Sequence, residues 1–422
     1  MSKILFFSSV FPQPGDPTRG TFCANLCTRL GRDHEVRVVS PWPWFRRVRT
    51  KRALVRDCVA SFAGEGVHAE YPPFLYPPRV LPRAHGELMW RSGRGAFRRA
   101  CAGRQPDSVL SYWAYPDGWA AIRAARAIGV PVGLIVGGSD VLLIDRHPAR
   151  DRFLESLNQA DLVMPVSRDL ARALGGLGVD DRKIHVVYQG VDEERFTPGD
   201  RQEARLRLGL SPEGPLLLWV GRMVPVKGLE ILLAAAAGLA RRGLPFEISL
   251  VGDGPLRTSL EARARSLGID GRVHFVGPRP QAQLPDWYRA SDLFVLPSYS
   301  EGIPNVLRES LACGRPFVAT RVGGVPELHD PSCRLVPAGS AAALADAIES
   351  VMGAEVDPAA LSGRALTGPG KTWPARSPPC STRAARQRRW SRVLHEQPRT
   401  LSTEEFPNDA HHDTRSHDAR GG

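Results

Sequence analysis

Short apolar runs alternate with stretches of helical periodicity along the first half of the chain. A run of four to eight apolar residues is typical of a buried strand, and apolar residues that recur every three or four positions are typical of an amphipathic helix. The expected strands are Ile4–Ser9, Val36–Ser40, Ser108–Ser111, Val130–Val136, Leu162–Val166 and Ile184–Val187, and the expected helices are Phe22–Leu30, Asp117–Ile128, Phe153–Gln159 and one from Arg168. Strands that alternate with helices in this way predict a parallel, doubly wound sheet.

The same alternation resumes after a polar stretch and predicts a second sheet. The expected strands are Leu216–Val220, Ile248–Val251, Val273–Val276, Leu293–Pro297 and Phe317–Ala319, and the expected helices include Leu229–Ala240 and Ala341–Val351. We therefore expect an α/β protein with two Rossmann-like domains, 1–196 and 216–355, joined by a linker over 197–215. Ligands of such sheets bind beyond the carboxyl ends of the strands, so the cleft between the two domains is the expected site.

The alternation fails in the last part of the chain. Residues 356–422 form a basic tail rich in Arg, Pro and Ser, without a sustained apolar period, and we expect it to be irregular and disordered. The prolines of 373–379 exclude a helix interior. One hypothesis is that the tail is out of its original reading frame, which would impair activity. A clean frame and a tail shared by related strains would refute it.

Much of the positive charge of the chain is concentrated in one segment, and this segment suggests which partners the protein could bind. The 422 residues carry a formal net charge of +12, and 46–104 alone holds 13 Lys and Arg against 4 Asp and Glu, interleaved with Trp42, Trp44, Phe45, Trp90 and Phe97. Two interpretations stay open for this segment: a contact with an anionic membrane or a lipid-diphosphate acceptor, or a solvated arginine-rich face. No nucleic-acid docking module is recognisable, so nucleic acid is not an expected partner.

The cysteines and the apolar segments of the chain indicate in which cellular compartment the protein is expected. The seven cysteines form neither a disulfide framework nor a zinc spacing. The short apolar run at the N-terminus is followed by prolines, Gly15 and Asp16 rather than by a cleavage site for a signal peptase, and the chain has no apolar segment of about 18 residues. We expect a cytoplasmic protein, either free or peripheral at the inner face of the membrane.

Two loops at the ends of expected strands carry candidate chemistry. Gly221-Arg222 and Lys227-Gly228 lie between a strand and a helix, where two cations suit a diphosphate; an ordinary charged loop is an equally good interpretation. In the second loop, Glu301 follows a strand, Asn305 is expected to cap the next helix, and Glu309 falls in its second turn. One carboxylate on the loop and one on the helix can flank a ligand held at the helix N-terminus.

Further glycine-rich turns follow other strands. They are Gly252-Asp253-Gly254-Pro255, Val322-Gly323-Gly324-Val325-Pro326-Glu327, the loop with Gly15 and Gly20, and Gly137-Gly138-Ser139-Asp140. Each turn alone is a weak signal, and none completes a dinucleotide or phosphate-loop fingerprint. The missing fingerprint after the first strand disfavours a dinucleotide-dependent oxidoreductase.

Taken in order, these motifs resemble the nucleotide-sugar glycosyltransferases of the two-domain B fold, above all glycosyltransferase family 4, over roughly residues 3–352. The segments 11–22 and 112–118 resemble members that build cell-surface polysaccharides. The resemblance implies that 1–196 binds the acceptor and 216–355 the donor. It implies donor binding by Gly20, Gly221, Arg222, Lys227, Gly252, Gly254, Gly277, Glu301, Gly302, Ile303, Asn305, Val306 and Glu309, acceptor-side roles for Gly138, Ser139 and Asp140, and a catalytic set of Glu301, Arg222 and Lys227.

The resemblance also implies the chemistry. Such enzymes retain the configuration of the sugar, transfer it from a nucleotide-diphosphate donor to a glycan or lipid-linked acceptor, and use neither a metal nor a cofactor. The chain has no Asp-x-Asp tripeptide of the kind that holds a diphosphate through a metal. No acid–base His can be assigned, because 109–115 contains none and His147 lies beyond the acceptor-side loop. The alternatives are a nucleotide-sugar epimerase of similar architecture and a non-catalytic remnant.

Overall fold

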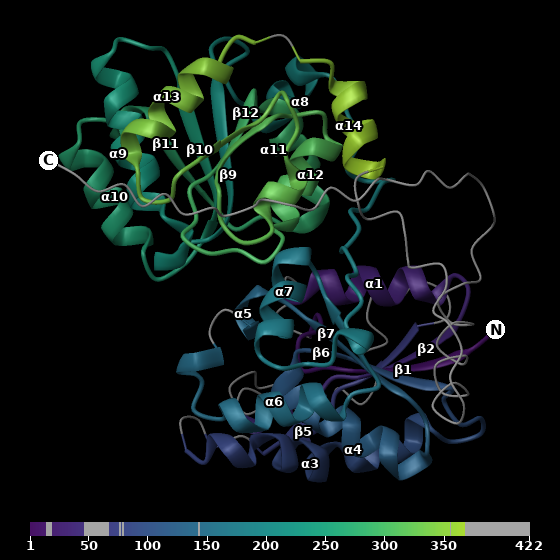
Figure 1. The fold of residues 1–422 in the computed structure, drawn as a ribbon. Helices are drawn as coiled ribbons and strands as arrows, with labels where there is room; N and C mark the ends of the chain where they lie inside the picture. The colour runs from purple at the N-terminus through teal and green to yellow at the C-terminus, as the bar shows by residue number, and fades with distance from the viewer. Residues whose placement is uncertain are drawn as a thin grey trace, which may run out of the picture.

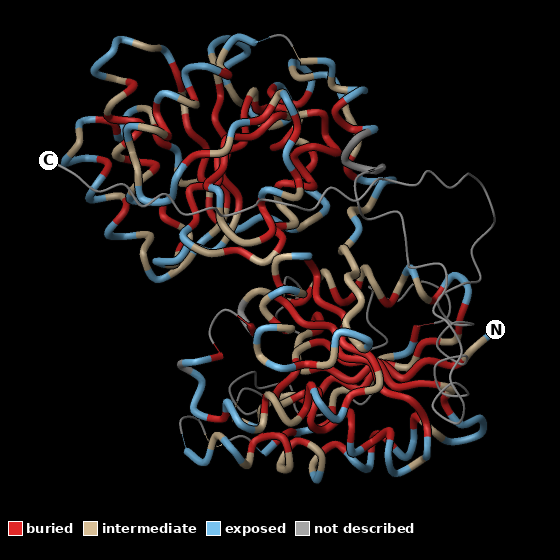
Figure 2. Tube along the Cα trace, in the orientation of Figure 1, coloured by how far each residue is buried: buried red, intermediate tan, exposed pale blue. Residues whose placement is uncertain are grey.

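Two α/β lobes make up the computed structural model, one from each half of the chain (Figure 1). The structure describes residues 1–13, 19–45, 67–75, 77, 80–141, 144–354 and 356–367. Each lobe has its own core of buried apolar side chains, and the strands form the buried centre of each lobe (Figure 2). The sequence-based expectation of two doubly wound domains is confirmed.

The N-terminal sheet has six parallel strands in the order β4-β2-β1-β6-β7-β8. The strands are β1 (Lys3–Phe7), β2 (Glu35–Val39), β4 (Val67–Glu70), β6 (Ser108–Tyr112), β7 (Val132–Val136) and β8 (Leu162–Pro165). Its helices include α1 (Thr21–Gly31), α3 (His85–Ala100), α4 (Trp119–Ile128), α5 (Gly138–Val141), α6 (Arg150–Gln159) and α7 (Arg168–Gly176). Strands β1, β6 and β7 are buried along their whole length, and β1 and β7 accordingly consist almost entirely of apolar residues.

The C-terminal sheet is also parallel, in the order β11-β10-β9-β12-β13-β14. Its strands are β9 (Leu216–Arg222), β10 (Glu247–Asp253), β11 (Val273–Gly277), β12 (Leu293–Leu296), β13 (Phe317–Thr320) and β14 (Arg334–Val336). Its helices include α9 (Leu229–Arg241), α10 (Arg257–Ser266), α11 (Leu284–Ala290), α12 (Asn305–Ala312) and α13 (Ala341–Val351). Because all the strands run in parallel, the loops that follow β9, β10 and β12 emerge at one edge of the sheet.

Three expectations about the elements are wrong. Ile184–Val187 is no strand, because only Ile184 forms a bridge, to Val163 of β8. The expected linker contains α8 (Arg201–Leu208), which packs against α11 because Arg205, 1% exposed, donates to the carbonyl of Ala290 at 3.0 Å.

The third correction concerns the start of the tail. A last helix, α14 (Pro358–Thr367), packs on α12: Leu361 is 3% exposed, and the Ser362 hydroxyl donates to the carbonyl of Ala312 at 2.8 Å. The regular part of the C-terminal lobe therefore extends beyond residue 356. The remainder of the expected tail, 368–422, lies outside the described residues.

Candidate active site

A lysine and a glutamate 74 positions apart form an ion pair at the carboxyl edge of the C-terminal sheet. The ammonium Nζ of Lys227 lies 2.7 Å from Oε1 of Glu301, and the Ser298 hydroxyl donates to the same oxygen at 2.6 Å. Lys227 belongs to the turn after β9, and Glu301 to the loop after β12. Glu301 is only 9% exposed, so the pair is a strong, partly desolvated charge-assisted contact.

Glycines allow these loops to approach one another. Gly228 has φ +63°, and a Cβ there would lie 2.1 Å from the carbonyl oxygen of Pro297, so a larger residue would push the Lys227 turn away from β12. Gly252 has φ +137°, and its Cβ would lie 1.8 Å from the carbonyl oxygen of Gly221. The ends of β9, β10 and β12 thus form one close-packed edge.

Arg222 ends β9 at this edge. It lies opposite Asp253 in the register of β9 with β10, its side chain is exposed, and among the described residues it has no side-chain partner. Gly254 follows Asp253, and a Cβ on it would lie 2.4 Å from the carbonyl oxygen of Met223. Gly277, with φ +82°, ends the neighbouring strand β11.

Helix α12 begins at Asn305, one residue earlier than expected if Asn305 were its cap. Pro304 occupies the cap position, so Asn305 is the first helical residue, and the expectation that it caps the helix is wrong. The side-chain oxygen of Asn305 is buried, and no described residue forms a hydrogen bond with it. Ile303 is buried in the core of the C-terminal lobe, and Val306 packs against it. The amides at the start of α12 follow the Glu301 loop directly, which makes this helix end a suitable place for an anion.

Glu309 lies in the second turn of α12, as expected, but it is buried. Its Oε2 accepts a hydrogen bond from the Tyr288 hydroxyl at 2.7 Å. Burial raises the pKa of Glu309 to about 7, against smaller lowering contributions from hydrogen bonds with Tyr288 and Gln281. At neutral pH, Glu309 is therefore present in both protonation states.

The two lobes meet at glycines. A Cβ on Gly138, which follows β7 and begins the short helix α5, would lie 2.6 Å from the amide nitrogen of Gly302, so this segment of the N-terminal domain touches the residue after Glu301. The amide of Gly324 donates to the carbonyl of Gly302 at 2.7 Å. Gly323, with φ +51°, lies so close that its Cβ would be 1.8 Å from the carbonyl oxygen of Glu301. Three glycine-rich loops from two domains therefore converge beside the Lys227–Glu301 pair.

Comparison with known proteins identifies the family. Residues 20–195 match the model described as Glycosyltransferase Family 4, and 214–353 match Glycosyl transferases group 1. The putative teichuronic acid biosynthesis glycosyltransferase TuaC of Bacillus subtilis is 31% identical over 364 residues, which cover 82% of this chain and 88% of TuaC. This chain belongs to glycosyltransferase family 4.

Other relatives of this family 4 glycosyltransferase match over less of their length. The D-inositol 3-phosphate glycosyltransferase 2 of Catenulispora acidiphila is 40% identical over 215 residues, which are 48% of this chain and 47% of that protein. Among solved structures, sucrose-phosphate synthase from Thermosynechococcus elongatus superposes with a TM-score of 0.70 at 21% identity, over 87% of this chain and 94% of the other. HepE from Anabaena in complex with UDP gives 0.65 at 20% identity, with the same coverages. These structures share the B fold.

The family 4 chain contains two residues in its N-terminal domain to which the sequence assigned no role. Asp117 is buried, its carboxylate accepts hydrogen bonds from the Ser9 amide and from the Ser8 hydroxyl, and burial raises its pKa to about 6. Trp113 has a positive φ of 79°, and its ring lies beside Gly137. Both belong to the segment 112–118. In the sequence, the feature that could have pointed to them is an Asp and a Trp directly after an expected strand.

For the other predicted site residues of the N-terminal domain, the structure describes Gly20 fully and Ser139 and Asp140 only in their backbone. Gly20, with φ +67°, starts α1 against the loop after β1, because its Cβ would lie 2.7 Å from the carbonyl carbon of Val10. Ser139 and Asp140 follow Gly138 in α5, but their side chains lie outside what the structure describes. In the described part of the chain, no three His, Cys, Asp or Glu residues are grouped as metal ligands, and no helix is long and apolar enough to cross a membrane.

Proposed function

We propose that this protein is a retaining glycosyltransferase that moves a sugar from a nucleotide-diphosphate donor to a glycan or lipid-linked acceptor in the synthesis of a cell-surface polysaccharide. The observation that carries the proposal is the Lys227–Glu301 pair at the edge of the C-terminal sheet, directly beside the contact of Gly138 with Gly302. A donor held at this edge would face the acceptor-side loop of the other domain.

The charges suit a reaction in which a diphosphate leaves. Cleavage of the bond between sugar and phosphate leaves negative charge on the diphosphate, and Lys227, Arg222 and the N-terminal amides of α12 are positive partners at one edge of the sheet. Glu301 would accept hydrogen bonds from hydroxyls of the donor sugar, and Glu309 from those of the ribose. Gly221, Gly252, Gly254 and Gly277 would give the donor room at the strand ends.

The relatives support the donor class and the biological role. HepE has been solved in complex with UDP and with UDP-glucose, and TuaC is named for teichuronic acid biosynthesis. The D-inositol 3-phosphate glycosyltransferases are named for a different acceptor, so the proposed polysaccharide role rests on the likeness to TuaC. We propose a hexose as the sugar that the donor carries.

The reaction as proposed uses neither a metal nor a cofactor. Among the described residues, Lys227 and Arg222 are cations that could take over the charge neutralisation that a divalent ion supplies elsewhere. A donor assay with and without a chelator tests this part: we expect equal rates, and a rate restored only by Mg²⁺ or Mn²⁺ would overturn it.

A donor-hydrolysis panel tests the function itself. The full chain is incubated with UDP-, GDP- and TDP-hexoses, and release of the nucleoside diphosphate is measured in the presence and absence of a lipid-diphosphate glycan. We expect release with one donor class, faster with acceptor, and a product that keeps the anomeric configuration. Conversion of the donor sugar without release of the nucleotide would indicate an epimerase, and no turnover of any donor would indicate a non-catalytic remnant.

A further inference from the structure

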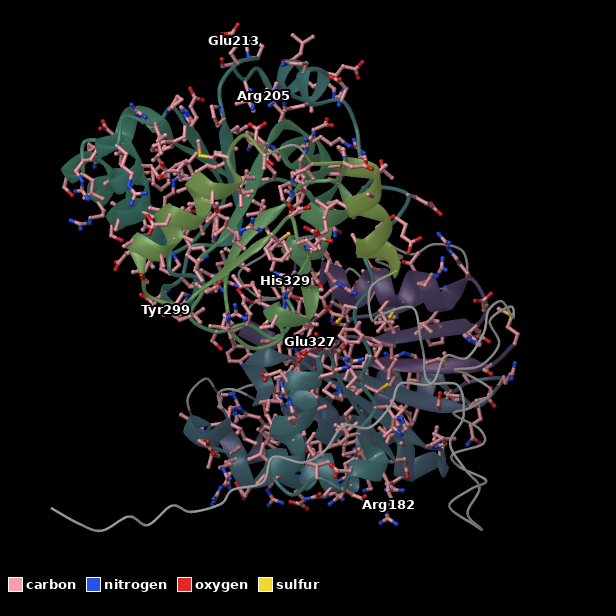
Figure 3. The ribbon with its side chains drawn as sticks, turned by 45° about the horizontal axis from the view of Figure 1, so that its top comes forward. Arg182, Arg205, Glu213, Tyr299, Glu327 and His329 are labelled. Carbon is pink, nitrogen blue, oxygen red and sulfur yellow. The ribbon has the colours of Figure 1, made fainter. Side chains whose placement is uncertain are left out.

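We propose that Glu327 is a positioning residue that clamps the two domains together at the start of α7. The expected effect on catalysis rests on the proposed function, whereas the clamp itself is inferred from contacts between the two domains. Glu327 lies in the turn Val325–Leu328 that follows Gly323 and Gly324 in the C-terminal domain. It lies where the two lobes meet (Figure 3).

Both carboxylate oxygens of Glu327 bind backbone amides of the other domain. Oε1 accepts from the amide of Asp169 and Oε2 from the amide of Arg168, each at 3.0 Å, and these are the first two residues of α7. The next amide, that of Leu170, donates to the hydroxyl of the helix's own cap Ser167 at 3.1 Å. The first amides of a helix have no partner within the helix and carry the positive end of its dipole, so an anionic side chain is the partner that stabilises them most.

A tyrosine extends the clamp to the helix that carries Glu309. The Tyr188 hydroxyl donates to Oε2 of Glu327 at 2.7 Å. On its other side, the guanidinium carbon of Arg308 lies 5.8 Å from the centre of the Tyr188 ring, and Arg308 is only 5% exposed. Tyr188 therefore connects Glu327 to α12 through a buried cation–π contact.

The same end of α7 touches the glycines beside Glu301. A Cβ on Gly302 would lie 3.5 Å from the Leu170 side chain, and one on Gly324 would lie 2.8 Å from the Cβ of Ser167. Helix α7 also packs beside α5, which begins with Gly138. If the bonds of Glu327 break, α7 and α5 lose their fixed position relative to the Glu301 loop.

A carboxylate is required because both of its oxygens are used. In Glu327→Gln, one oxygen still accepts, but the amide NH₂ would face a second N–H donor, so one of the two bonds to α7 is lost. In Glu327→Ala, both are lost. Since each hydrogen bond to a charged group shifts an equilibrium by about tenfold or more, loss of both bonds should open the start of α7 about a hundredfold more often or beyond.

Hydrogen exchange on the full chain tests the clamp without any substrate. Peptides that cover residues 166–171 are followed by mass spectrometry in the wild type, Glu327→Gln, Glu327→Ala and the control Glu349→Gln, whose carboxylate pairs with Arg242 within the C-terminal domain. We expect exchange about a hundredfold faster in Glu327→Ala, about tenfold faster in Glu327→Gln and unchanged in the control. Equal exchange in all four proteins would overturn the clamp.

Kinetics test its role in positioning. If Glu327 positions the domains and does not touch the donor, its substitution lowers kcat by about tenfold or more and leaves the dissociation constant of the nucleoside diphosphate within about twofold of wild type. Weaker nucleotide binding with unchanged kcat would overturn the positioning role, because Glu327 would then be a donor-binding residue. If the wild type turns over no donor, the proposed function fails, and the exchange experiment still decides the clamp.

Discussion

Lys227 has two anions to neutralise in the proposed reaction. In the structure it pairs with Glu301 at 2.7 Å, and in the transition state it would also face the leaving diphosphate. We expect Lys227→Ala to lower kcat by about 10²–10³, the cost of removing one donor that stabilises developing negative charge, or about 2.7–4 kcal/mol. Steady-state donor hydrolysis measures the loss. A rate within twofold of wild type would remove Lys227 from the catalytic set.

A lysine in the other domain provides the control for this substitution. Lys183 donates to the carbonyl of Asn158 in the N-terminal domain, and its neighbour Arg182 lies at the far end of that lobe from Glu327 (Figure 3). Lys183→Ala removes the same charge and side-chain length, and we expect it to leave kcat unchanged.

Glu309 should give donor binding a pH dependence. Burial raises its pKa to about 7, and its charged form accepts hydrogen bonds, from Tyr288 and from the ribose hydroxyls, more strongly than its neutral form does. As the pH falls below 7, the dissociation constant of the nucleoside diphosphate should therefore rise, by up to about tenfold per pH unit, as expected for one group. Calorimetric titration between about pH 5.5 and 8.5 measures it, and Glu309→Gln should be weaker and flat. The same slope in the variant would assign the dependence to another group.

Folding stability should respond to Glu309 in the opposite direction. Its pKa in the folded protein lies above the ordinary value of 4.5, so the folded state binds more protons than the unfolded state between about pH 4.5 and 7. The contribution of this residue to stability is thus fully present below about pH 4.5 and decreases as the pH rises towards 7. Donor binding and stability therefore require different protonation states of one side chain.

At the scale of elements, Gly138 is where a loop of one domain touches a loop of the other. A Cβ on Gly138 would lie 2.6 Å from the Gly302 amide, and backbone on both sides leaves no flexible side chain to yield. We expect Gly138→Ala to separate the loops and lower transfer more than about tenfold while nucleotide affinity stays within about twofold. Gly176→Ala, a site in α7 with no atom within 4 Å of the new Cβ, is the matched control. Equal transfer rates in the two variants would contradict a functional contact.

The elements that the sequence predicted are those with strong apolar periodicity. Strands β1, β7 and β9 have long runs of buried residues, whereas β14 has three residues and its burial is uneven. Helix α8 was missed because its buried side includes Arg205, a residue that a hydropathy pattern counts as exposed. Asn305 was taken for a cap because it is a common capping residue, but the preceding proline occupies that position.

At the scale of the whole molecule, the sequence predicted which residues gather at the carboxyl edge of the C-terminal sheet, but it did not predict the junction of the domains. The motifs around Arg222, Lys227 and Glu301 follow strands, so their convergence follows from parallel topology. Glu327 and Arg168 are 159 positions apart and belong to different domains. The bond between them uses a backbone amide, which any residue except proline supplies, so no residue type marks it in the sequence. Contacts between backbone and a remote side chain of this kind leave no periodic pattern in the sequence.

The structure shows that most arginines in the described part of the basic segment 46–104 form ion pairs, which leaves few of them to bind an anionic partner. Residues 46–66 lie outside the described part, and Phe97 is buried in the N-terminal core. Four of the six arginines between 80 and 104 are paired with carboxylates; they are Arg83 with Asp151, Arg91 with Glu87, Arg99 with Glu70, and Arg104 with Asp107. Arg94 and Arg98 are exposed one turn apart on α3, and neither has a carboxylate partner among the described residues.

We propose that the protein binds an anionic membrane, because its proposed acceptor is linked to a lipid. Substitution of these two arginines tests whether the described surface contributes to that binding. Because each arginine contributes about 1 kcal/mol near an anionic surface, the contribution of Arg94 and Arg98 should be small and should disappear at about 1 M salt, where the Debye length is about 3 Å. We expect the full chain to sediment with vesicles that contain anionic lipid and not with neutral ones. The double substitution Arg94→Glu and Arg98→Glu should reduce this binding, whereas Arg263→Glu with Arg265→Glu, exposed on α10 of the other domain, should not. Equal binding by both double variants would place the contact outside α3, and binding that persists at high salt would show that it is not electrostatic.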